Sequence, residues 1–145
     1  MSATTERRLS AIMLADIAGF SSLMEMDESA TFDRVRELRE QLVTPRIAEH
    51  GGRIIKTTGD GFLAEFPSAT SALRCGVEIQ RANQAREESR PEGQRIHMRI
   101  GLNVGDIITD GDDIAGDGVN IAARLEALAP LDGICVSGTV REHIR

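Results

Sequence analysis

The sequence contains no tryptophan and no tyrosine, and aromatic residues make up only 3% of its 145 residues. Proteins that bind single-stranded nucleic acid stack the bases on aromatic side chains, which this chain can scarcely supply. A formal net charge of −6 also argues against general binding to nucleic acid or to an anionic membrane surface. We therefore expect neither a nucleic-acid partner nor a membrane partner.

Cysteine is scarce as well: Cys75 and Cys135 lie far apart in apolar surroundings, which predicts buried thiols in a reducing compartment. The pair Arg7 and Arg8 before an apolar run imitates a signal peptide, but Asp16 interrupts the run and no small-residue cleavage site follows. No segment approaches the roughly 18 consecutive apolar residues of a membrane-spanning helix. These features predict a soluble cytoplasmic protein.

Hydrophobic residues make up 41% of the chain and charged residues 28%, which is ordinary for a globular protein. We expect residues 1–145 to form a single domain. Apolar periodicity and turn residues predict an α+β fold with a mixed, mainly antiparallel sheet, helices on one face, and a βαββαβ core of the ferredoxin-like or polymerase-palm class. The expected strands are 9–15, 53–57, 62–66, 96–104, 106–109 and 133–137, and the expected helices are 27–50, 68–88, 118–128 and a last turn to residue 145.

Two aspartates carry the strongest functional signal. Asp16 and Asp60 each end a short apolar run close to glycine, and Asp60 lies in the predicted hairpin turn 58–61. Either one alone is more simply explained as a turn or cap residue. Because both have similar contexts, and because magnesium is held by one or two carboxylates plus substrate phosphates, the pair predicts a metal-dependent enzyme that acts on a nucleotide.

Two further pairs are weaker signals. Asn120 and Arg124 are four residues apart and share one helical face, where they could contact a ribose and a phosphate, although a solvated polar face is the simpler interpretation. Lys56 and Asp113 could contact the edge of a base, although Lys56 could be an ordinary exposed strand residue and Asp112 is an equally good acceptor. The P-loop, dinucleotide-binding and EF-hand patterns are absent or incomplete.

Taken together, these motifs resemble those of the class III nucleotidyl cyclases, the catalytic domain of adenylate and guanylate cyclases. The matching segments are 15–21 (ADIAGFS), 56–60 (KTTGD) and 113–124 (DIAGDGVNIAAR). The resemblance implies conversion of ATP to 3′,5′-cyclic AMP and pyrophosphate at a site that two copies of the chain share in a homodimer. It also implies two Mg²⁺ or Mn²⁺ ions in each site.

The resemblance also implies a role for each residue of the site. Asp16 and Asp60 would hold both metals with help from the Ile17 carbonyl, and Lys56 and Asp113 would select adenine. The remaining roles are triphosphate binding by the backbone amides of Gly19, Phe20 and Ser21, ribose orientation by Asn120, and stabilisation of the reacting phosphate by Arg124.

Family members normally continue past Arg145 with a strand pair and a lysine that contacts the polyphosphate. We therefore expect weak or absent activity from residues 1–145 alone, and any regulatory domain to lie C-terminal to them. Two alternatives remain open. One is a non-catalytic dimerisation or ATP-binding module, and the other is a diguanylate cyclase, whose hairpin normally reads GG(D/E)EF, whereas residues 58–62 read TGDGF.

Overall fold

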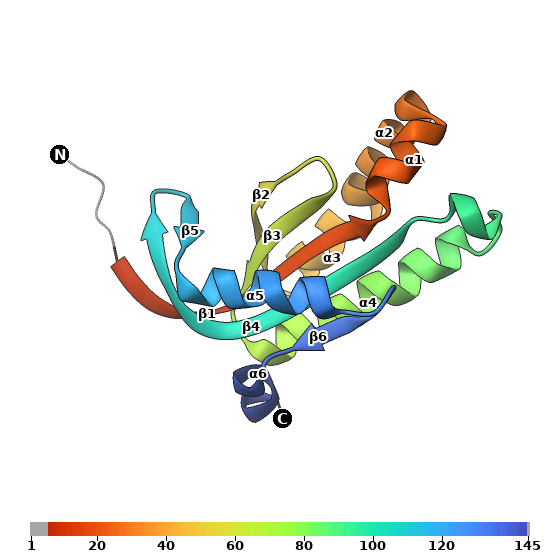
Figure 1. Ribbon diagram of the computed structural model, residues 1–145. Coiled ribbons are helices and arrows are strands. Elements are labelled where there is room, and N and C mark those ends of the chain that lie inside the picture. Colours follow the sequence, from red (N-terminus) through yellow and green to blue (C-terminus); the bar gives the residue numbers. More distant parts are fainter. Residues whose placement is uncertain (1–5, 145) are drawn as a thin grey trace.

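The computed structural model describes residues 6–144, which fold around a single curved six-stranded sheet (Figure 1). The strand order is β2-β3-β1-β4-β5, and β6 pairs with β4 beside this path. The strands are β1 (Glu6–Ala18), β2 (Arg53–Thr57), β3 (Gly61–Phe66), β4 (His97–Asp110), β5 (Asp113–Ala115) and β6 (Ile134–Val136). The helical segments are α1 (Phe20–Met26), α2 (Glu28–Glu37), η1 (Leu38–Val43), α3 (Thr44–Glu49), α4 (Ala69–Glu87), η2 (Glu92–Gln94), α5 (Asp117–Leu128) and α6 (Gly138–His143).

The predicted α+β palm-type core is confirmed. Strands β1 and β4 lie side by side at its centre, β3 and β2 continue the antiparallel sheet beyond β1, and β6 pairs parallel to β4. Helices α1 to α3 connect β1 to β2, and α4 connects β3 to β4. This is the βαββαβ arrangement, extended by β5, α5, β6 and α6.

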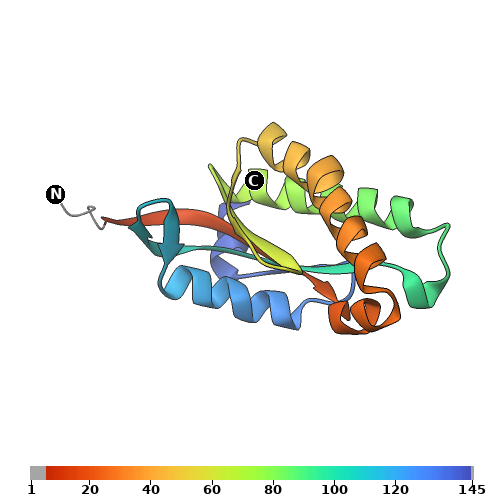
Figure 2. The same cartoon turned by 90° about the horizontal axis from the view of Figure 1, so that it is seen from above.

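The helices cover both faces of the sheet, so the prediction of helices on one face is wrong. Figure 2 shows α2, α3 and α4 on one side of the sheet and α5 on the other. Successive residues of β1 point to opposite faces. Met13 and Ala15 therefore pack in the core under α4 and its neighbours, whereas Ile12 packs with Ala122 of α5. Both faces of the central strands are apolar, which is why β1 shows an unbroken apolar run instead of an alternating pattern.

Two strand predictions need correction. β1 does not end at Asp16 but continues to Ala18, because it is hydrogen-bonded on both sides, with Asp16 opposite Gly61 of β3 and Arg99 of β4. β4 does not break at Gly105, because pairing with β1 along almost its whole length keeps that glycine extended. The strand that returns against the end of β4 is the short β5, not residues 106–109.

The helix expected over 27–50 is divided into α2, η1 and α3, and α1 precedes it. The η1 segment is π-helical, with the Thr44 N–H bonded to the Arg39 carbonyl five residues earlier. Pro45, directly after this bond, has no N–H and crowds the carbonyl four residues before it, so a wider turn relieves the crowding. The expected helices 68–88 and 118–128 form as α4 and α5, and the expected last helical turn ends at His143. None of the helices in residues 6–144 combines the length and the apolar character that crossing a membrane requires.

Candidate active site

Asp16 and Asp60 meet where the end of β1 lies against the β2–β3 hairpin. Asp16 is opposite Gly61 in the ladder, and the Ile17 N–H donates a hydrogen bond of 2.8 Å to the Asp60 carbonyl. A Cβ on residue 61 would lie 2.1 Å from the Ala15 carbonyl oxygen, so only glycine allows the hairpin to come this close to β1. Backbone pairing thus brings the two predicted metal-binding segments together.

One oxygen of the Asp16 side chain is buried without a hydrogen bond from the protein. This oxygen is Oδ1, and the Arg99 Nε is 3.5 Å away. Asp60 accepts a long hydrogen bond of 3.4 Å from the Thr58 hydroxyl. The Asp16 Oδ1 thus has an arginine charge nearby but accepts no hydrogen bond. A buried carboxylate oxygen of this kind is well suited to a hard divalent cation, so these residues fit the magnesium or manganese that the resemblance implies.

Within residues 6–144, no three His, Cys, Asp or Glu side chains are arranged to hold a metal ion by themselves. Asp16 and Asp60 are therefore two protein carboxylates without a third such ligand. This arrangement is typical of magnesium sites that are completed by substrate phosphates and water.

Glu126 of α5 also belongs to this site, and the sequence interpretation missed it. Its side chain is buried and lines the same cavity as Asp16 and Asp60, and its Oε1 has no hydrogen-bond partner. Burial raises the pKa of Glu126 to about 8, and the neighbouring Asp16 acts in the same direction, against the opposing charge of Arg99. The sequence did contain a signal for the burial of Glu126, because Glu126 follows Val119 and Ala122 at helical spacing on the apolar side of α5.

Lys56 and Asp113 are brought together by β2 and β5. The Lys56 Nζ donates a hydrogen bond of 3.2 Å to Asp113, and the Ile114 N–H donates one of 2.8 Å to the same carboxylate. These two hydrogen bonds, the backbone one first, lower the pKa of Asp113. Both side chains are about half exposed. Of the two neighbouring aspartates, Asp113 is thus the one that contacts Lys56.

Asn120 and Arg124 lie on the exposed side of α5, one turn apart. Asp16, Asp60, Lys56 and Glu126 line a cavity of about 330 Å³, together with Val119 and Ala123 of α5. Neither Asn120 nor Arg124 lines this cavity. Within one chain, the predicted transition-state pair is therefore exposed and does not line the cavity of the predicted metal site.

The predicted triphosphate-binding residues follow β1 directly. Gly19 and Ser21 are exposed, Phe20 is half-buried, and α1 begins at Phe20. No side chain caps this helix, so its first amides keep their hydrogen-bonding capacity. These amides lie within three to five residues of Asp16 in the chain, so they lie close to the predicted metal-binding carboxylates.

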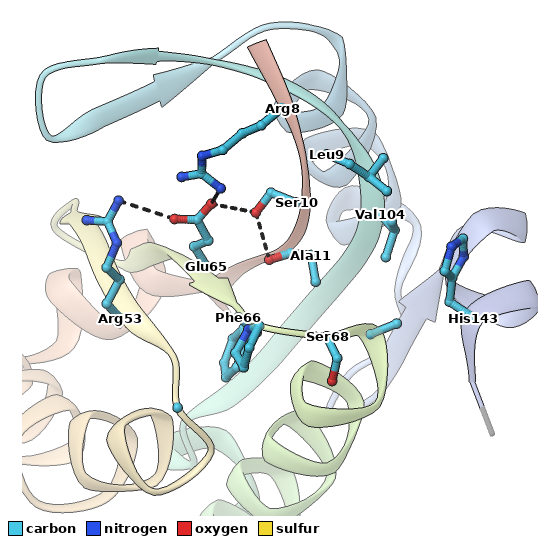
Figure 3. A pocket seen from close by; sticks show the side chains of 13 residues that line it. Arg8, Leu9, Ser10, Ala11, Arg53, Glu65, Phe66, Ser68, Val104 and His143 are labelled. Atoms are coloured by element: carbon cyan, nitrogen blue, oxygen red, sulfur yellow. Dashed lines mark hydrogen bonds and ion pairs between the residues drawn. The ribbon is translucent and has the colours of Figure 1, made fainter. Parts of the chain in front are cut away.

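A second polar cluster lies at the other end of β1 (Figure 3). The buried Glu65 contacts Arg8, Arg53 at 3.2 Å and the Ser10 hydroxyl at 2.6 Å, beside a cavity of about 470 Å³. Burial tends to raise the pKa of Glu65, but the hydrogen bonds from Arg8 and Ser10 and the two arginine charges lower it overall. Ser10 is six residues from Asp16, roughly 20 Å along an extended strand, so this cluster is separate from the predicted metal site.

Comparison with known proteins supports the motif analysis. Residues 4–145 match the family described as the adenylate and guanylate cyclase catalytic domain. "Putative adenylate cyclase 3" of Rhizobium meliloti strain 1021 is 43% identical over 138 residues, which are 95% of this chain and 24% of that protein. An adenylate cyclase of Streptomyces coelicolor is 31% identical over 139 residues, which are 96% of this chain and 35% of that protein. The chain therefore spans between a quarter and about a third of these two relatives.

A solved structure is also similar over nearly the whole chain. The crystal structure of an adenylate/guanylate cyclase/hydrolase from Silicibacter pomeroyi is 52% identical, with a TM-score of 0.90 over 96% of this chain and 81% of that one. The family match, the relatives and the fold agree with the motifs at 15–21, 56–60 and 113–124. The chain belongs to the class III nucleotidyl cyclases.

Proposed function

We propose that this chain is the catalytic domain of an adenylate cyclase. In the proposed reaction the ribose 3′-oxygen of ATP attacks the α-phosphorus and loses its proton. The bond from the α-phosphorus to the oxygen that bridges to the β-phosphate breaks, and pyrophosphate leaves as 3′,5′-cyclic AMP closes. The observation that carries the proposal is the meeting of Asp16 and Asp60, together with the buried and unpartnered Oδ1 of Asp16.

The two aspartates would hold two Mg²⁺ or Mn²⁺ ions, with help from the Ile17 carbonyl. When bound, such ions supply positive charge that offsets the phosphates and favours ionisation of the 3′-hydroxyl. Gly19, Phe20 and Ser21 would donate backbone N–H groups to the triphosphate. The rest of the catalysis is positioning and electrostatic stabilisation, as in phosphoryl transfer generally.

Base selection is assigned to Lys56 and Asp113. An ammonium group donates to the adenine ring nitrogen, and a carboxylate accepts from the exocyclic amine. Guanylate cyclases usually carry Glu and Cys, or similar residues, at these two positions, so the pair favours ATP. The 3.2 Å contact between them supports a joint role.

The active site is proposed to be shared by two copies of the chain. Asn120 and Arg124 are exposed and do not line the cavity that Asp16 and Asp60 line, so a second copy is needed to bring Arg124 to a metal-bound phosphate. The exposed side of α5 also carries Ile121 and Leu128, of which Leu128 is 75% exposed. A twofold dimer that covers this surface would contain two equivalent sites.

Complementation between two inactive variants tests the shared site. Asp16→Ala removes the metal ligand and Arg124→Ala removes the transition-state group, so neither homodimer of the whole protein should form cyclic AMP. Mixed in equal amounts, half of the dimers are heterodimers with one intact site of two, which predicts about a quarter of the wild-type rate. No recovery from two folded variants that exchange subunits would refute the shared site.

A further inference from the structure

Unsatisfied polar atoms gather behind the proposed metal site. In the described part of the chain, six buried side-chain nitrogen or oxygen atoms lack a hydrogen-bond partner. Three of the six are Asp16 Oδ1, Arg99 Nε and Glu126 Oε1. Arg99 is 3.5 Å from Asp16, and Glu126 lines the same cavity as Asp16, so the three belong to one cluster.

Such a cluster requires an explanation, because a buried polar group without a hydrogen-bond partner destabilises the fold. An apolar side chain at position 126 would pack on the sheet like Ala122, one turn earlier on the same face of α5. Instead, α5 places a carboxyl in the cavity that Asp16 and Asp60 also line. The burial of Glu126, which leaves 6% of it exposed, excludes a role in solvation of the helix.

We infer that Glu126 is a positioning residue that holds the metal-binding carboxylate of Asp16 in its own chain. Carboxylates that bind metals are themselves held by hydrogen bonds, and the loss of such a partner typically costs 10–100-fold in metal affinity or activity. Glu126 and Arg99 approach Asp16 from α5 and β4, and together they restrict its orientation. This inference rests on the proposed function and adds a residue to it.

The geometry of α5 separates this role from that of Arg124. Two residues along an α-helix correspond to about 200° of rotation, so Glu126 and Arg124 project from nearly opposite sides of α5. Glu126 points inward to Asp16 of its own chain, whereas Arg124 points outward, to the surface proposed to meet the partner. Glu126 should therefore act on the metal half of the site in its own chain only.

Metal binding provides the first test, without turnover. Mn²⁺ affinity is measured by electron paramagnetic resonance in the presence of a non-reactive ATP analogue, for E126A, E126Q and E126D. E126A should raise the Mn²⁺ dissociation constant at least tenfold. E126Q keeps a hydrogen-bonding group of the same shape and should restore most of the affinity. E126D keeps the carboxyl but shortens the side chain, which moves the carboxyl away from Asp16. E126D should therefore bind Mn²⁺ more weakly, and it supplies the test if E126A does not fold.

Gln80→Ala is the matched control. Gln80 is also buried on a helix that packs on the sheet, and it donates a 3.1 Å hydrogen bond to the Met98 carbonyl of β4, but on the other face. Q80A should lose stability and keep its Mn²⁺ affinity. The inference would be overturned if folded E126A and E126D bound Mn²⁺ with wild-type affinity, or if Q80A and E126A lost Mn²⁺ affinity equally. It would also be overturned if the wild type bound no Mn²⁺.

The second test places E126A on either chain of the complementing pair. The R124A chain supplies Asp16 to the one working site, so E126A on that chain should lower the recovered rate at least tenfold. On the D16A chain, which supplies only Arg124 to that site, E126A should have little effect. The reverse pattern, or equal losses on both chains, would overturn the inference. If the parental pair shows no recovery, the shared site fails instead, and the Mn²⁺ measurements decide the role of Glu126.

Discussion

Substitution of Gly101 by alanine should move α5, because this helix lies directly on β4 at that residue. A Cβ on residue 101 would be 2.4 Å from the Glu126 nitrogen, 2.5 Å from the Ala122 carbonyl oxygen and 2.9 Å from the Glu126 Cα. All three atoms belong to the backbone, so no side chain can rotate away. Restoring ordinary contact, which begins near 3.4 Å, requires α5 to shift by about 1 Å.

Overpacking of this kind costs about 1–3 kcal/mol, and contact with backbone places G101A at the upper end. Alanine recovers about 0.5–1 kcal/mol because it restricts the unfolded chain and suits a strand better than glycine. A net loss of about 2 kcal/mol in the free energy of unfolding corresponds to a melting temperature lower by roughly 4–8 °C for a domain of this size. Since α5 carries Glu126 and Arg124, a 1 Å shift should also lower kcat, by up to about 100-fold.

Urea unfolding and the rate of cyclic AMP formation by the whole protein measure the two effects. Gly93→Ala is the control, because a Cβ there meets nothing within 4 Å and the residue has no positive φ. The free energy of unfolding of G93A should lie within about 0.5 kcal/mol of the wild-type value, and its rate of cyclic AMP formation should be unchanged. If G101A matched G93A in both stability and rate, the packing of α5 on Gly101 described above would be wrong.

Three further predictions concern other parts of the molecule. Because the pKa of Glu65 in the folded protein lies below its ordinary value of 4.5, its contribution to stability is present above pH 4.5 and is lost as the pH falls through the folded pKa. Glu65→Gln should therefore reduce the loss of stability below pH 4.5, measured as the free energy of unfolding against pH. An unchanged loss in this pH range would contradict the prediction. Burial raises the pKa of Cys75 to about 12, so roughly one thiol in 10⁴ is ionised at pH 8, and mass spectrometry should find Cys75 alkylated only after unfolding; stoichiometric labelling of the native protein would count against it. Lys56→Glu combined with Asp113→Cys should change the ratio of kcat/KM for GTP and ATP in favour of GTP by about tenfold or more, whereas an unchanged ratio would remove both residues from base selection.

Local patterns were sufficient to predict several elements. The TTGDG turn between two apolar segments predicted the hairpin that carries Asp60, and helical spacing predicted α4 and α5. These signals depend on residues close together in sequence, which is why they can be interpreted without knowledge of the fold. The contact between Lys56 and Asp113, 57 residues apart, was not predicted, because side-chain chemistry indicated only that each could contact the edge of a base.

Long-range pairing explains the errors. Gly105 is a common strand breaker, yet pairing with β1 along β4 keeps it extended, and nothing close to residue 105 in the sequence indicates this. The position of α5 on the face opposite α4 depends on how the chain crosses the sheet after β5. Glu126 was missed because a glutamate on a helix is usually solvated, and only the packing of α5 on the sheet shows that it is buried in the same cavity as Asp16.

Cyclic-nucleotide formation by the whole protein, with ATP and with GTP, in Mg²⁺ and in Mn²⁺, tests the central claim most directly. The Asp60→Ala variant, shown by circular dichroism to be folded, is measured beside the wild type. We predict 3′,5′-cyclic AMP from ATP, much less product from GTP, a requirement for divalent metal, and no turnover by D60A. Cyclic GMP as the main product, or turnover by D60A at the wild-type rate, would contradict the proposed adenylate cyclase and its metal site.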